Sequence, residues 1–253
     1  MAVNCRPLVS TVAAALLLLS ACGAQTTIVA NPPPSTPIAE RGVSCGDTPY
    51  PREALRGPTG AEDSDHPAAE VLRKEIELVE GAELAPTDEW RLVVDAPDDA
   101  VFAGGAVEDL AESGLNAEYR AEKVDGEWRT AGISFGCRPS VDTGEQSRVD
   151  FYLAPGTDPA PEATSIPGLV QDPSCGGRDV LDRMDEPLIE YGPDEVLVLL
   201  TADPLKGMHT CEGFPPSEYN LELAEPIGQR KLLDAGFYPA VEVHVYEDGP
   251  RPR

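Results

Sequence analysis

The sequence predicts an α+β fold in which one N-terminal helix and several antiparallel strands precede a mostly β second half. Only one segment, near residues 65–81, has the apolar periodicity of an amphipathic helix of ordinary length. Short alternating apolar segments follow it, separated by glycine and proline, which is the pattern of strands joined by turns. The second half therefore predicts a β-sandwich or an antiparallel sheet.

The N-terminus carries an apolar run that precedes the folded region. The run Val9–Leu19 is too short to cross a membrane as a helix, so residues 1–21 predict a signal peptide. It ends in Leu19-Ser20-Ala21-Cys22, which resembles the lipobox of bacterial lipoproteins. The resemblance implies that Cys22 is the lipid-bearing first residue of the mature chain, at the outer face of the cell membrane. Ordinary secretion with cleavage near Ala24 is the alternative.

A proline-rich segment follows Cys22. Residues 22–44 include Asn31-Pro32-Pro33-Pro34-Ser35-Thr36-Pro37 and show no apolar periodicity, so they predict a tether. A flexible chain of about 22 residues reaches about 26 Å, and the prolines extend it further. The folded region then divides into an α+β half, residues 45–155, and a mainly β half, residues 156–253. We leave open whether the two halves are separate domains or pack as one.

The first folded element is a predicted helix. Asp65 is a candidate N-cap, Pro67 suits the first turn, and Gly81 is a candidate stop. An apolar stripe at helical spacing lies between them: Ala68, Leu72, Ile76 and Val79.

Strands follow the helix. Trp90–Asp95 alternates, Ala100–Ala103 is a shorter strand, and Val107–Ala111 suits a short helical turn. The clearest local signal is Asp125-Gly126, which suits a type I′ hairpin turn because both central residues there take positive φ. It joins Asn116–Val124 to Glu127–Gly136. Counting outward from the turn gives two cross-strand pairs: Glu122 opposite Arg129 and Tyr119 opposite Gly132.

The second half is almost wholly β in pattern. Alternating segments occur at Val149–Leu153, Tyr219–Leu223 and Val241–Val245. Val196–Leu200 is continuously apolar and predicts a central strand buried on both faces. A short helix is expected at Asp179–Met184. Three passages, residues 194–204, 211–213 and 221–236, resemble uncharacterised secreted proteins of actinobacteria, a resemblance that implies no activity.

Four cysteines remain after the signal peptide and Cys22, namely Cys45, Cys137, Cys175 and Cys211. In an extracytoplasmic protein they predict two disulfides, with three possible connectivities. We favour Cys45 with Cys137 and Cys175 with Cys211, because each pair then lies within one half of the chain. The four do not have the spacing of zinc ligands, so no metal is expected there.

Charge and motifs limit the function. A net charge of −26 disfavours nucleic acid and anionic lipid headgroups as partners, so we expect membrane contact only through the lipid. No motif of a nucleophile elbow, zinc protease or phosphate loop is present, and no cofactor is expected. Each histidine has an ordinary explanation: His66 starts the predicted helix, His244 faces outward from a strand, and His209 lies in a loop beside Cys211.

Acidic clusters at Glu62–Asp65, Asp95–Asp99 and Asp179–Glu186 suit either calcium or a carboxylate hydrolase, but none fits the twelve-residue calcium loop. The sequence therefore predicts a lipid-anchored envelope protein with a binding or structural role rather than an enzyme. Its expected partner is an envelope protein or a cell-wall ligand. The alternatives are a small cell-surface hydrolase, using carboxylates or a site near His209, and a calcium-binding surface module.

Overall fold

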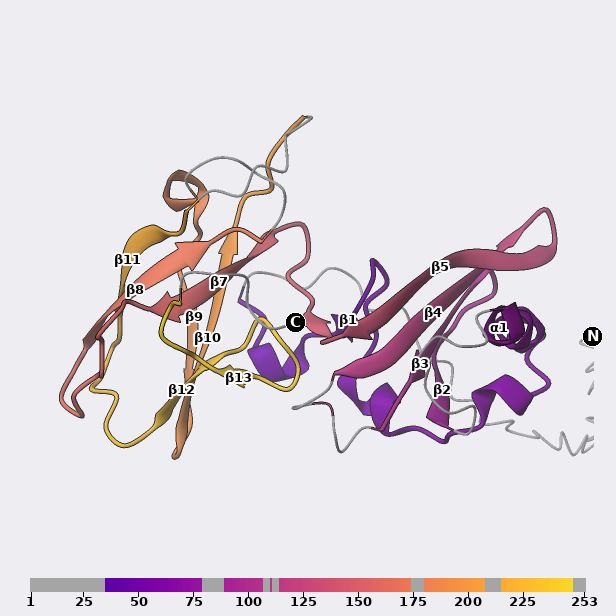
Figure 1. Cartoon of the computed structure of the whole chain (residues 1–253), viewed down its shortest axis with the longest axis horizontal. Coiled ribbons are helices and arrows are strands. Elements are labelled where there is room, and N and C mark those ends of the chain that lie inside the picture. The colour runs from indigo at the N-terminus through magenta and orange to yellow at the C-terminus, as the bar shows by residue number, and fades with distance from the viewer. Residues whose placement is uncertain are drawn as a thin grey trace, which may run out of the picture.

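The computed structural model describes residues 35–78, 89–106, 110, 114–173, 180–207 and 215–247. In these residues the chain is a mixed α+β structure with one α-helix and mostly β-sheet (Figure 1), as the sequence predicts. No helix in the described part is long and apolar enough to cross a membrane. Several predicted features lie outside the described residues: the signal peptide, Cys22, Val79, Gly81, the turn at Val107–Ala111 apart from Leu110, Cys175, Cys211 and His209.

The helix is α1 (Pro67–Leu78), and short 3-10 helices occur at η1 (Ile38–Glu40), η2 (Arg52–Arg56), η3 (Ala61–Asp63) and η5 (Leu181–Arg183). The first strands are β1 (Val43–Ser44), β2 (Trp90–Asp95), β3 (Asp99–Gly104), β4 (Leu115–Val124), β5 (Glu127–Cys137) and β6 (Ser140–Val141). The later strands are β7 (Ser147–Leu153), β8 (Ser165–Gln171), β9 (Leu188–Tyr191), β10 (Glu195–Ala202), β11 (Ser217–Glu222), β12 (Lys231–Asp234) and β13 (Val241–Glu242).

Strands β2 to β5 form a four-stranded antiparallel sheet in sequential order. The apolar stripe of α1 packs against one face of this sheet, where Leu72 joins a fully buried cluster with Trp90 and Phe102. The predicted amphipathic helix is thus confirmed, because its apolar side chains are buried against the strands that follow it in sequence.

The N-cap of α1 is His66, and the prediction of Asp65 is wrong. The Nδ1 atom of His66 accepts a hydrogen bond from the backbone N–H of Ala68 at 3.2 Å. The imidazole packs edge-to-face against Trp128, with 5.6 Å between ring centroids, and its Nε2 lies 3.3 Å from a carboxylate oxygen of Asp95. These contacts from two distant strands hold the ring over the first turn.

The β4–β5 hairpin has the predicted turn, with φ values of 54° at Asp125 and 84° at Gly126. Glu122 lies opposite Arg129, as predicted. The second predicted pair is wrong, because Tyr119 lies opposite Ile133 rather than Gly132. The register shifts between Arg120 and Ala121, where a β-bulge places one extra residue on β5.

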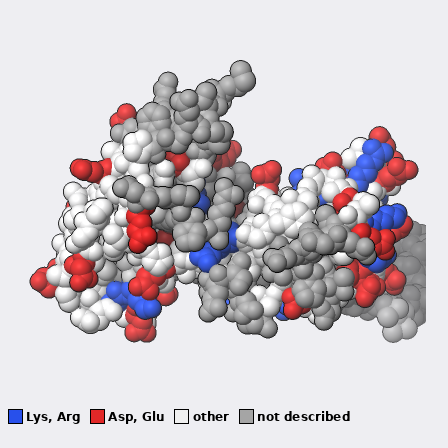
Figure 2. All heavy atoms as spheres, in the orientation of Figure 1, with Lys and Arg blue, Asp and Glu red and all other residues white. Residues whose placement is uncertain are grey.

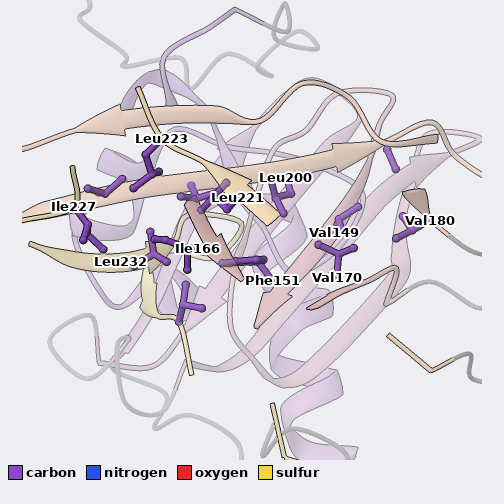
Figure 3. Packing of buried hydrophobic residues seen from close by; sticks show 14 residues of the cluster. Val149, Phe151, Ile166, Val170, Val180, Leu200, Leu221, Leu223, Ile227 and Leu232 are labelled. Atoms are coloured by element: carbon purple, nitrogen blue, oxygen red, sulfur yellow. The ribbon is translucent and has the colours of Figure 1, made fainter. Parts of the chain in front are cut away.

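The second half holds a seven-stranded sheet in the order β11-β8-β7-β10-β12-β13, with β9 paired to β10. Its pairings are antiparallel except for β10 with β12, which is parallel. The segment after β13 returns to β7 through a bridge between Val245 and Leu153, which links β7, β10, β12 and β13 in a closed series of pairings. Fourteen buried residues of this half form one hydrophobic cluster (Figure 3).

Strand β10 is central, as predicted, and its two faces contribute to two different clusters. Val196, Val198 and Leu200 belong to the cluster of the second half. Leu199 is 2% exposed and belongs to another cluster, which also contains Val94 and Leu115 of the first sheet. Apolar contacts therefore join the two halves of the chain.

The folded region begins inside the segment 22–44 that the sequence predicts as a tether. Ile38 and Val43 are buried in the cluster that joins the halves. The backbone N–H of Ile38 donates to Glu190 of β9 at 2.6 Å, and the buried Arg41 donates to the carbonyl oxygen of Asp142 at 3.0 Å. Lone apolar residues among polar ones give no periodicity, so the sequence does not indicate this packing.

Candidate binding site beside the disulfide

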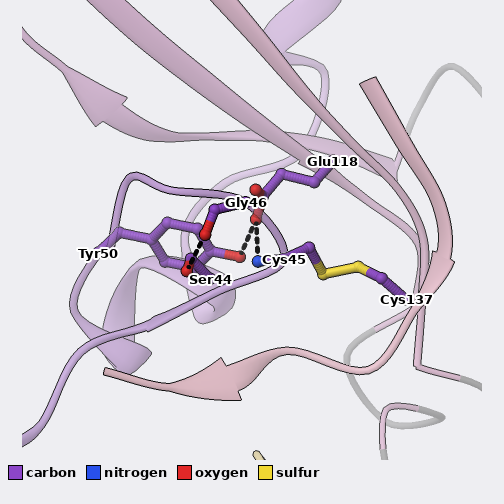
Figure 4. Close-up of a disulfide and its surroundings, with 6 residues drawn as sticks. All are labelled: Ser44, Cys45, Gly46, Tyr50, Glu118 and Cys137. Atoms are coloured by element: carbon purple, nitrogen blue, oxygen red, sulfur yellow. Dashed lines mark hydrogen bonds between the residues drawn. A yellow bond between two sulfur atoms is a disulfide. The ribbon is translucent and has the colours of Figure 1, made fainter. Parts of the chain in front are cut away.

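A disulfide joins Cys45 to Cys137, with 6.0 Å between their Cα atoms. It links the loop after β1 to the last residue of β5 (Figure 4). This confirms the predicted pairing of these two cysteines. The other predicted pair, Cys175 with Cys211, lies outside the described residues.

A buried carboxylate lies next to this disulfide. Glu118 of β4 is 6% exposed, and its Oε2 atom accepts hydrogen bonds from the backbone N–H of Cys45 at 2.9 Å and the hydroxyl of Tyr50 at 2.8 Å. Both donors lie in the loop after β1, which also carries Cys45 of the disulfide (Figure 4). The loop is thus fixed to the sheet by one covalent bond and by charge-assisted hydrogen bonds.

Burial changes the acidity of both partners. Loss of water raises the pKa of Glu118, and the hydrogen bonds from Cys45 and Tyr50 lower it by less, so the net pKa is raised. Burial also raises the pKa of Tyr50 well above its usual value, and the neighbouring Glu118 raises it further. Tyr50 therefore stays a hydrogen-bond donor throughout the neutral range.

A small hollow opens beside Glu118. It has a volume of about 180 Å³ and lies between the loop Gly46–Thr48 and the segment Ala131–Ser134 of β5, with Arg120 at its side. Gly132 lies opposite Arg120 in the register, and a Cβ placed there would meet nothing within 4 Å. The absence of a side chain at Gly132 thus leaves this space open beside Arg120.

The charges around the hollow are unequal. Arg120 forms a two-point ion pair with Asp99, with N–O distances of 2.9 Å and 3.3 Å, and this pair raises the pKa of Arg120 most. Glu122 and Asp47 raise that pKa further, so carboxylates outnumber the one cation here. Asp47 and Glu118 also line the hollow. This excess of carboxylates favours binding of a cationic or hydrogen-bond-donating group over binding of an anion.

A second hollow, of about 470 Å³, lies over β8 and β11 in the other half. Its lining includes two proline rings, Pro155 and Pro167, and the polar side chains Glu218 and Asn220. Glu218 is the sole carboxylate among its described lining residues, so it lacks the acid pair that a carboxylate hydrolase needs.

The structure does not bring the sequence-predicted candidates into one site. His66 caps α1, and His244 is exposed, as expected. Asp185 of the third acidic cluster accepts a hydrogen bond from the hydroxyl of Thr201 at 2.8 Å. Within the ranges described, no group of three or more histidine, cysteine or acidic side chains is placed to hold a metal ion.

Sequence reasoning missed Glu118 and Tyr50. In a chain with 45 acidic residues, a glutamate on an alternating strand is indistinguishable from a solvated one. Tyr50 is 68 residues away in sequence, and only the fold brings its hydroxyl to the carboxylate.

Comparison with known proteins adds no relationship, since no family model, curated sequence or solved structure matches the chain.

Proposed function

We propose that the protein is a lipid-anchored envelope protein at the outer face of the cell membrane, and that its folded region acts by binding an envelope partner. The Cys45–Cys137 disulfide is the observation that carries this proposal, because such bonds persist in oxidising, extracytoplasmic compartments. It agrees with the lipobox-like Leu19-Ser20-Ala21-Cys22, which supplies the anchor.

The start of the folded region sets the length of the tether. In the part of the chain that the structure describes, the first buried side chain is that of Ile38, so the proposed tether spans residues 22–37. A flexible chain of about 16 residues has a root-mean-square reach of about 20–24 Å, which its prolines extend. This reach is enough to hold a small folded region clear of lipid headgroups.

Lipidation is tested by intact mass and detergent partitioning. The mature chain should begin at a diacylated Cys22 and enter the detergent phase. The variant Cys22→Ala should be released or remain unprocessed, whereas the matched variant Cys5→Ala, which lies inside the signal peptide, should behave as the unaltered protein. An unmodified mature chain beginning near Gln25 would contradict the proposal.

A surface hydrolase is the second candidate, because Asp47 and Glu118 share one hollow and burial raises the pKa of Glu118. The hollow is smaller than the roughly 300–1,000 Å³ of ordinary small-molecule sites, so binding is favoured over turnover of a sugar chain. Release of reducing ends from purified cell wall, lost in Glu118→Gln with the fold intact, would establish the hydrolase instead.

A further inference from the structure

Strand β5 is an unpaired edge of the first sheet. It spans Glu127–Cys137, and in the described part of the chain β4 alone pairs with it. Figure 1 shows it along the outer border of that sheet. Long open edges present unpaired backbone N–H and C=O groups, and proteins commonly block them with proline or lysine. Strand β5 contains neither residue, and its charged residues, Glu127 and Arg129, and its bulge lie toward the hairpin turn, before Gly132.

The two faces of β5 differ in chemistry. Ile133 and Phe135 are 37% and 48% exposed and lie opposite Tyr119 and Ala117, on the face that α1 covers elsewhere. Gly132 and Ser134, which alternate with Ile133 and Phe135 along the strand, line the hollow on the other face. In Figure 2 the surface over the half of β5 nearer the disulfide carries few charges, and the charges gather at the tip of the β4–β5 hairpin.

An added strand would alternate its side chains in the same way. One set would lie beside Ile133 and Phe135, and the other set would point toward the hollow. Asp47 and Glu118 line that hollow, and the charge of Arg120 is balanced by Asp99. A hollow of about 180 Å³ accommodates one long side chain rather than a larger ligand.

We propose that β5 receives an extended polypeptide as an additional strand, with apolar side chains against Ile133 and Phe135 and a lysine or arginine in the hollow beside Glu118. This mode combines main-chain hydrogen bonds with pockets for alternate side chains. The net charge of −26 favours a basic partner at long range and opposes a second copy of the chain. The inference rests on the proposed binding role and names its partner class.

The test uses the mature lipoprotein in detergent and two capped peptides, Val-Lys-Val-Lys-Val-Lys-Val and the same sequence with glutamate for lysine. Hydrogen exchange is measured by mass spectrometry over Glu127–Cys137. The lysine peptide should slow exchange there by about tenfold or more at saturation, and the glutamate peptide should not. Asp47→Asn should weaken lysine-peptide binding about threefold, while the matched exposed substitution Asp158→Asn leaves it unchanged.

A second variant tests the edge itself. Phe135→Lys places a cation at an exposed position and should abolish the slowing while the fold is retained. The proposal would be overturned if the lysine peptide left exchange over β5 unchanged, if both peptides slowed it equally, or if slowing were confined to another edge strand such as β2 or β11. Dimerisation through β5 without peptide would overturn it too. Loss of the lipid would leave these exchange rates unchanged, so failure of the anchor and failure of the docking edge are distinguishable.

Discussion

Replacing Tyr50 by phenylalanine removes one hydroxyl from the buried contact with Glu118 and leaves the ring in place. The hydroxyl lies 2.8 Å from the carboxylate, Tyr50 is fully buried, and Glu118 is 6% exposed. A buried hydrogen bond to a charged group contributes about 1.5–3 kcal/mol, because the carboxylate left behind has no water to replace the donor. We therefore expect Tyr50→Phe to lower the free energy of unfolding at pH 7 by about that amount.

The loss should depend on pH in a defined direction. The Tyr50 hydrogen bond lowers the pKa of Glu118, so its removal raises that pKa further above the unfolded value. A carboxyl group with a raised pKa in the folded state contributes stability below its unfolded pKa, and loses it as pH rises through the folded pKa. The difference between the two proteins should therefore be largest at neutral pH and shrink as acid protonates Glu118.

Urea denaturation from pH 4 to 8 measures both effects. Tyr246→Phe is the matched control, because Tyr246 is partly exposed and its ring packs edge-on against Tyr152, with 5.3 Å between ring centroids. The assignment of Tyr50 as a donor to an ionised Glu118 would be refuted if Tyr50→Phe lowered the free energy of unfolding no more than the control does. A decrease in that free energy that grows toward acid pH would refute it too.

Three further predictions concern the fold. Replacing Cys45 and Cys137 by alanine should lower the free energy of unfolding by up to about 4.6 kcal/mol, because the cysteines are 92 residues apart; an unchanged urea midpoint would contradict this. His66→Ala should cost about 1 kcal/mol and speed amide exchange in the first turn of α1, since the N-cap acceptor is lost. Gly168→Ala should cost about 1–3 kcal/mol in thermal unfolding, because a Cβ there overlaps the ring of Phe151, and an equally stable variant would exclude that close packing.

The elements that local sequence specifies were predicted well. The stripe of α1, the Asp125-Gly126 turn and the apolar strand β10 all depend on residues within a few positions of one another. The N-cap of α1 was missed because histidine is not among the residues that usually cap helices, and contacts from remote strands hold His66 in that position. Local composition also could not reveal the bulge in β5, because the pairing of strands, rather than their content, places it.

The sequence by itself determined the class of the fold and the expectation of a lipid-anchored envelope protein, since these depend on composition, periodicity and a short motif. It narrowed the disulfides to three connectivities, and the structure selected Cys45 with Cys137. Only the tertiary structure decided the parallel pairing of β10 with β12, the packing of Ile38 between the halves and the site at Glu118. Each of these joins residues far apart in the chain. Their free energy comes from burial and hydrogen bonds that exist only after the chain has folded, so no local pattern encodes them.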